Sequence, residues 1–179
     1  MIGALVFGSF MAVTLPQEIV GRWVQPCQNK AIREEVLRDN TATLTEDYYL
    51  DTACRERLLT FRNEGGLQAQ DGKMDFSFTR VVIALHSQAF VEDFNDRAVC
   101  GYQNWIAGLE RDITGMTCAL FNPAKPAPSP KAGDMRYGIY KVEENKLYFG
   151  QLTLQHDALT PEKRPITFDP RFYTKQQSE

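Results

Sequence analysis

The chain has 179 residues, of which 43% are hydrophobic and 11% aromatic, and its formal net charge at pH 7 is −3. This length and composition describe one folded domain with a substantial core and exclude an intrinsically disordered chain. The 20 basic residues are scattered among 23 acidic ones, so no positive patch indicates nucleic-acid binding.

The N-terminal segment 1–15 carries no charge and is rich in apolar side chains. Its length suits the apolar core of a signal peptide and is too short to span a bilayer. No Lys or Arg precedes it and Ala12-Val13-Thr14 is a poor cleavage site, so a retained amphipathic helix or first strand is the alternative. Residues 16–179 are expected to form a single domain, and no later segment indicates an integral membrane span.

A first strand is predicted over residues 19–25. Gly21 allows another backbone to come close, Trp23 can plug the floor of a small barrel, and Pro26 ends the ladder because it has no N–H to donate. The alternative is an ordinary strand with one core Trp.

Residues 28–40 are polar and charged, with a helical turn as the only candidate element, near residues 31–37. A strand with one solvated face follows over 41–50.

The clearest strand is predicted over residues 73–85, after strands at 58–63 and 67–70 that a tight break at Gly65-Gly66 separates. Asp71-Gly72 is a hairpin signal. Apolar side chains alternate from Met74 to Phe78, and after Arg80 the apolar positions change parity. Either a bulge lies there or the strand is buried on both faces.

A change to helical period predicts one short helix over residues 87–97. The Pro-rich stretch 123–131 is expected to be a long extended loop. Residues 135–142 and 146–153 are predicted to form a hairpin, and 165–169 a short last strand that Pro170 ends. The total is about seven to nine antiparallel strands with one short helix, which predicts a mostly β fold: a barrel or half-barrel.

The four cysteines are widely spaced and include no C-x-x-C pair, which argues against a zinc site and against a redox centre. Two disulfides in an exported protein are expected. Four cysteines allow three pairings; Cys27–Cys54 and Cys100–Cys118 are favoured because each pair brackets one local unit. Four buried free thiols in a cytosolic protein are the alternative.

Gly21-Arg22-Trp23 is similar to the G-x-W signature of lipocalins, which close an eight-stranded barrel around an apolar ligand. The chain more specifically resembles the adenomatosis-polyposis-coli-down-regulated family of extracellular Wnt inhibitors, whose domains are lipocalin-like. The segments that carry this resemblance are Trp23 to Cys27, Tyr48 to Cys54, Leu85-His86, Cys100-Gly101 with Trp105 and Arg111 to Thr114, Leu147 to Gly150, and Arg164 to Phe168. The chain holds one such unit rather than a tandem pair. The resemblance implies the fold and an apolar or acyl-chain ligand, and it does not imply a role in Wnt signalling.

No pattern in the chain indicates a catalytic centre or a resident cofactor. The two histidines, His86 and His156, belong to no H-x-x-x-H or H-E-x-x-H metal pattern, and the chain has no G-x-S-x-G elbow and no phosphate-binding glycine loop. Arg111-Asp112 is interpreted as an ion pair that holds a loop. We therefore expect no catalytic residues, no metal and no cofactor.

What remains is a site made by shape, because a barrel of about eight strands has room for one small ligand. The candidate ligand-binding walls are Phe61, Met74, Phe76, Phe78, Tyr137, Ile139 and Tyr148, with Arg80 as an anchor for a carboxylate or phosphate head. The alternative is that these side chains fill the barrel, and that the protein is a secreted adhesion or inhibitor module whose surface loops contact a protein partner. The favoured expectation is an exported, lipocalin-like protein, secreted or periplasmic, that binds an apolar or amphipathic lipid-like molecule.

Overall fold

The computed structural model describes residues 14–177 of the chain. The apolar segment expected at 1–15 therefore lies outside the described residues up to position 13, and its last residue, Leu15, packs in the core. The strands are β1 Gly21–Gln28, β2 Ala31–Arg38, β3 Thr41–Tyr49, β4 Arg57–Gln70, β5 Lys73–Leu85, β6 Glu110–Asp112, β7 Thr117–Cys118, β8 Ala127–Pro128, β9 Met135–Glu143, β10 Lys146–Phe149 and β11 Tyr173–Lys175. The helix α1 spans Gln88–Asp96, and short 3₁₀ turns lie at Val99–Gly101 and Pro161–Lys163.

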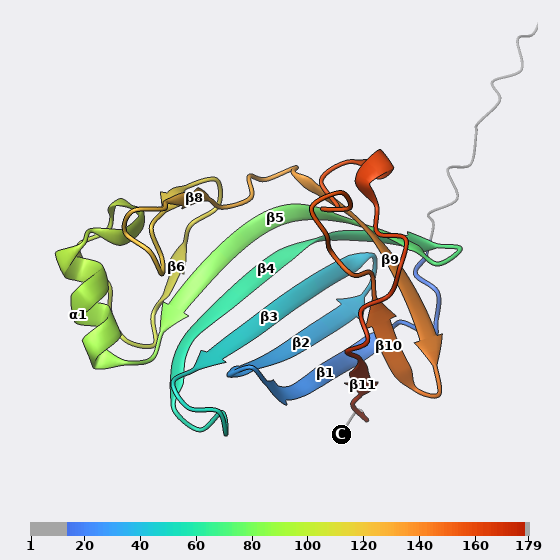
Figure 1. Cartoon of the computed structure of the whole chain (residues 1–179), viewed down its shortest axis with the longest axis horizontal. Helices are drawn as coiled ribbons and strands as arrows, with labels where there is room; N and C mark the ends of the chain where they lie inside the picture. The colour runs from blue at the N-terminus through green and yellow to red at the C-terminus, as the bar shows by residue number, and fades with distance from the viewer. Residues whose placement is uncertain (1–13, 178–179) are drawn as a thin grey trace, which may run out of the picture.

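Eight strands close into an antiparallel barrel in the order β4-β3-β2-β1-β11-β10-β9-β5, with β5 pairing back onto β4. Pairing of β1 with β11, which sets Trp23 opposite Lys175, joins the two ends of the described chain. Figure 1 shows β1 to β5 side by side in one strongly curved sheet, with β9 beside β5. The predicted mostly β barrel with one helix is confirmed.

The strand β5 organises the barrel because it reaches beyond it at one end. Residues 73–77 pair with β9 inside the barrel, whereas residues 82–84 pair with the short strand β6. Pairing with β4 shifts between Glu64–Arg80 and Gly65–Phe78, so Thr79 is an extra residue. The predicted change of parity is therefore a bulge. Beyond it Val82 and Ala84 are buried as well, so the second predicted explanation also holds.

The hairpin expected at Asp71-Gly72 is confirmed, since both residues have positive φ (50° and 74°) as a type I′ turn requires. Other boundaries were predicted wrongly. Gly65-Gly66 does not break the chain, because β4 runs through both residues. The strand β1 continues past Pro26. The last strand is β11 rather than 165–169, where only one bridge, between Gly150 and Phe168, forms.

The segment 28–40 differs most from its prediction, because it contains a full strand, β2, instead of a helical turn. Its side chains alternate across the barrel wall, with Ala31, Glu35 and Leu37 buried. The alternation was hidden because two of the four inward positions, Arg33 and Glu35, carry charged side chains. An inward charged residue does not register in a pattern of apolar periodicity.

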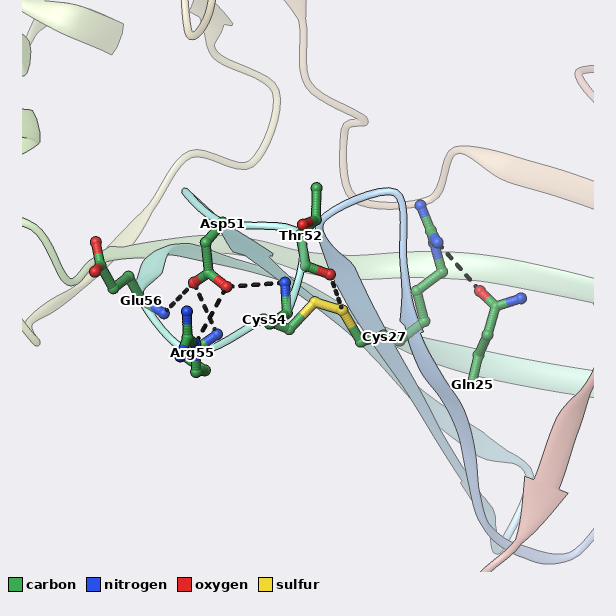
Figure 2. Close-up of a disulfide and its surroundings, with 9 residues drawn as sticks. Gln25, Cys27, Asp51, Thr52, Cys54, Arg55 and Glu56 are labelled. Carbon is green, nitrogen blue, oxygen red and sulfur yellow. Dashed lines mark hydrogen bonds and ion pairs between the residues drawn. A yellow bond between two sulfur atoms is a disulfide. The ribbon is translucent and has the colours of Figure 1, made fainter.

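Both favoured disulfides are present, Cys27–Cys54 and Cys100–Cys118. The first ties the end of β1 to the loop between β3 and β4 (Figure 2). In that loop the Asp51 carboxylate accepts backbone N–H groups from Ala53, Arg55 and Glu56. These bonds, above all the one from Glu56, lower the pKa of Asp51 to about 2. The carboxylate that holds the loop together therefore stays ionised over most of the pH range.

The second disulfide joins the 3₁₀ turn after α1 to β7. The helix α1 itself lies beyond the end of the barrel (Figure 1). Val91 and Phe94 are the buried face of the helix, and the Phe94 ring meets Trp105 edge to face at 5.4 Å between centroids. Asn95 accepts the Trp105 backbone N–H and donates to its carbonyl, which fixes the loop against the helix. Among residues 14–177, no helix combines the length and apolar character needed to cross a membrane.

Candidate functional site

One end of the barrel is closed by a layer of buried apolar side chains. Trp23 has no exposed surface, and its indole N–H donates to the Ile19 carbonyl at 2.7 Å. The ammonium group of Lys175 lies over the Trp23 ring, 5.2 Å from its centroid. The same layer contains Leu37, Ala42, Leu67, Phe76 and Leu147. These side chains belong to the hydrophobic core and fill this end of the barrel.

Towards the other end, the mouth, the inward side chains become polar. Arg33 of β2 and Glu46 of β3 face each other across the strand pair and form an ion pair. Each side chain keeps 25% of its surface exposed although it points inwards, which shows that the upper interior is open to solvent. Arg33 also donates to the Gln25 side-chain oxygen at 3.1 Å, which links β2 to β1.

Glu35 lies one inward position below Arg33, at the boundary between the apolar layer and the open mouth. It stands between Trp23 and Leu44 in the strand register and is 8% exposed. Burial raises the pKa of its carboxyl group well above the usual range, nearby Glu46 adds to the rise, and a hydrogen bond from Tyr173 and the charge of Arg33 oppose it. Its Oε2 atom has no hydrogen-bond partner among the described residues.

A pocket of about 320 Å³ opens above this boundary, which we call the mouth pocket. Its lining residues are Gln25, Arg33, Phe149, Gly150, Gln151, Leu152, Asp169, Arg171 and Tyr173. The Arg171 guanidinium donates to both oxygens of Asp169, and this bond holds the pKa of Asp169 below its usual range. Phe149 and Tyr173, whose rings meet edge to face at 5.2 Å, supply an apolar wall. The pocket thus combines one apolar wall with five polar or charged side chains, those of Gln25, Arg33, Gln151, Asp169 and Arg171.

A second pocket, of about 350 Å³, lies where the Pro-rich loop passes over the inward side chain of Phe61. Its other lining residues include Leu120, Phe121 and Pro128. The Phe121 ring approaches Tyr48 of β3 at 5.9 Å but remains 63% exposed. The loop expected at 123–131 therefore forms a partial cover over one side of the mouth.

Of the expected wall residues, four point into the barrel: Phe61, Met74, Phe76 and Phe78. Phe61 lines the second pocket. Met74, Phe76 and Phe78 are at most 9% exposed and pack against one another and the apolar layer, with Phe76 and Phe78 edge to face at 4.8 Å. For these three side chains the alternative holds: they fill the barrel and do not line a ligand cavity.

Tyr137, Ile139 and Tyr148 lie on the outer face of the barrel, which corrects their expected position on the interior wall. In β9 the inward positions are the even-numbered ones, because Gly138 pairs with Met74 and Arg136 with Phe76. The long segment between β10 and β11 covers the outer face: Arg164 donates to the Gly138 carbonyl at 2.6 Å and lies over the Tyr137 ring. The sequence pattern was misleading because these outward residues are apolar and half-buried.

Arg80 also points outwards, because the bulge at Thr79 moves it off the face of Phe76 and Phe78. It forms an ion pair with Asp112 at 3.1 Å and approaches Glu64 at 3.9 Å, so it is not the expected anchor for a ligand head group inside the barrel. The inward cation near Phe78 is instead Arg136, whose guanidinium lies 5.3 Å from the ring centroid. Within the described range Arg136 makes no ion pair.

The polar residues of the mouth were missed by sequence reasoning. Arg33 and Glu35 lie in the segment 28–40, which was interpreted only as polar and charged with a helical turn, and Glu46 was not singled out within the strand predicted over 41–50. A signal does exist: Ala31, Arg33, Glu35 and Leu37 share one parity, with apolar residues at both ends. A buried charged pair between apolar positions of the same parity is typical of a strand that lines a polar cavity.

The remaining candidate groups form separate structural contacts. His86 bonds the Thr60 hydroxyl at 2.8 Å, and burial lowers its pKa, with the charge of Arg57 adding to the effect. His156 contacts the Arg164 carbonyl at 3.0 Å. Arg111 donates to the Asn104 carbonyl, whereas Asp112 accepts from Arg80 and Thr114. No cluster of three or more potential metal ligands occurs within residues 14–177.

Comparison with protein-family models gives no match, and comparison with curated protein sequences gives none either.

Proposed function

We propose that this protein binds a small amphipathic molecule in the mouth pocket of its barrel. The observation that carries the proposal is the division of the interior into a filled apolar floor and an open pocket of about 320 Å³ with both apolar and charged walls. Small-molecule sites are typically concave, of roughly 300 Å³ or more, and largely apolar with a few orienting polar groups. The apolar part of the ligand lies against Phe149, Leu152 and the Tyr173 ring.

Two further features support a lipocalin-like carrier that is exported. Trp23 of the G-x-W residues pairs with Lys175 of β11 and is fully buried at the filled end, as expected for a side chain that plugs the floor of the barrel. Two disulfides are typical of proteins that fold in an oxidising compartment. Both features support the proposal that the protein is a lipocalin-like binding protein that acts outside the cytosol.

The test compares two leucines of the same loop. Leu152 lines the mouth pocket, whereas Leu154 is 99% exposed and does not. Titration with the neutral fluorescent probe N-phenyl-1-naphthylamine should give saturable binding to the wild-type protein. Leu152→Glu should weaken this binding at least about tenfold because it places a charge against the apolar part of the probe. Leu154→Glu should leave it within about twofold.

Equal effects of the two substitutions, or no saturable binding by the wild-type protein, would contradict the proposal. The second result would favour the alternative in which the barrel is a scaffold and its loops contact a protein partner. Leu154 and Ile166 (74% exposed) would then be the first residues to test, because a protein interface buries such side chains.

A further inference from the structure

Glu35 is the one inward carboxyl group of the mouth region for which the described chain provides no cation of its own. Arg33 is paired with Glu46, and Arg171 with Asp169. Lys175 of β11, which pairs with Trp23, lies over the Trp23 ring and directs its ammonium group to the Glu18 carbonyl at 3.4 Å. The Tyr173 hydroxyl bonds Glu35, Arg33 acts on it only through its charge while paired with Glu46, and the Oε2 atom of Glu35 is buried without a hydrogen-bond partner among the described residues.

A buried acceptor without a partner is unfavourable, and a buried carboxylate without a counter-charge is more so. The carboxyl group of Glu35 therefore either keeps a proton or acquires a positive charge from elsewhere. The mouth pocket reaches it from above, since Tyr173 lines the pocket and hydrogen-bonds Glu35, and Arg33 lines the pocket one inward position away. The polar head of a ligand in this pocket is therefore separated from Glu35 by a single residue, either Tyr173 or Arg33.

From this arrangement we infer that the ligand is an amphipathic amine whose ammonium head pairs with Glu35. This inference rests on the proposed binding function and adds the class of head group. The ammonium replaces both the Tyr173 hydroxyl bond and the proton of the carboxylic acid. The proton balance is that neutral Glu35 loses one proton to solvent and the incoming ammonium keeps all of its own, so the charge of the interior is unchanged.

An anionic head group is disfavoured because the two guanidinium groups that line the mouth pocket already have carboxylate partners. The inward cation without an ion pair, Arg136, lies in the neighbouring hollow beside Ser129 and Lys131. A carboxylate ligand would have to bind there instead.

The experiment compares octylammonium, octanol and octanoate by isothermal titration calorimetry at pH 7, in two buffers with different ionisation enthalpies. The wild-type protein should bind octylammonium at least about tenfold tighter than octanol, as expected for a charge-assisted hydrogen bond. The difference in heat between buffers should report release of up to about one proton per ammonium bound and none for octanol.

Glu35→Gln, which keeps the shape of the side chain, should remove both the tenfold preference and the proton release while octanol still binds. Glu34→Gln is the matched control, because Glu34 pairs with Arg22 on the outer face of the same strand and should change neither quantity. Tyr173→Phe removes the competing hydroxyl and should retain the preference for the amine.

Equal affinities for octylammonium and octanol would overturn the inference, because no ion pair with Glu35 would then add to the binding, and would leave the proposed function standing. Tighter binding of octanoate would overturn it in favour of an anion at Arg136. Failure of octylammonium and octanol alike to bind would overturn the inference and the proposed function together.

Discussion

At the scale of single residues, Glu35 links stability to pH. Its pKa is raised in the folded protein, mainly by burial, so between the unfolded and folded pKa values the folded state binds more protons than the unfolded state. The contribution of this group is therefore most favourable below its unfolded pKa and declines as pH rises through the folded pKa. Each unit of the shift corresponds to roughly 1.4 kcal/mol.

We expect Glu35→Gln to become progressively more stabilising, relative to the wild-type protein, as pH rises from 5 to 8. The amide carries no charge that burial could penalise, so the variant lacks the decline with pH. Urea unfolding of both proteins at several pH values measures the difference in free energy of unfolding. A difference that is constant with pH, or that falls, would show that Glu35 is not held as the neutral acid.

At the scale of elements, the pairing of β4 with β5 next to the bulge depends on Gly65. A Cβ atom at this position would lie 2.1 Å from the Ser77 carbonyl oxygen and 2.7 Å from the Phe76 ring. The pairing of Gly65 with Phe78 directly follows the bulge at Thr79, where the two strands bend. Backbone atoms of β5 cannot move away without breaking this ladder, so the space must remain empty.

Gly65→Ala should therefore lower the free energy of unfolding by about 3 kcal/mol or more, as forced overpacking does. Gly66→Ala is the matched control, because no atom lies within 4 Å of a Cβ built there. It should change stability by less than about 0.5 kcal/mol or improve it, since alanine loses less conformational freedom in a strand than glycine. Equal losses in the two variants would mean that the close approach of β5 is not what Gly65 provides.

Local sequence signals predicted some elements well and missed others for one physical reason. The hairpin at Asp71-Gly72 and the parity change after Arg80 follow from backbone conformation and period, which neighbouring residues express directly. The strand β2 was missed because its inward side chains face a polar interior. Tyr137 and Tyr148 were placed inside because apolar residues on a strand indicate burial without saying which side is covered. The covering segment, which contains Arg164, is distant in sequence.

At the scale of the whole molecule, the barrel class and the disulfides could be predicted, whereas its closure and its site could not. Closure depends on pairing β1 with the three-residue strand β11, and these two strands lie at opposite ends of the described chain. The mouth pocket forms only where these strands meet the segment that carries Asp169 and Arg171. A site assembled from long-range pairing leaves no local pattern, so only the apolar half of the interior was foreseen.

The central claim is that the barrel carries one small amphipathic molecule. Native mass spectrometry of the protein, purified from its own host without detergent, tests it most directly. We predict a discrete added mass on the folded chain that is lost under denaturing conditions and extracts as an amphipathic compound. If the protein is purified without a ligand, we predict that it takes up one added octylammonium or octanol molecule. A bare chain that takes up neither compound would contradict the account.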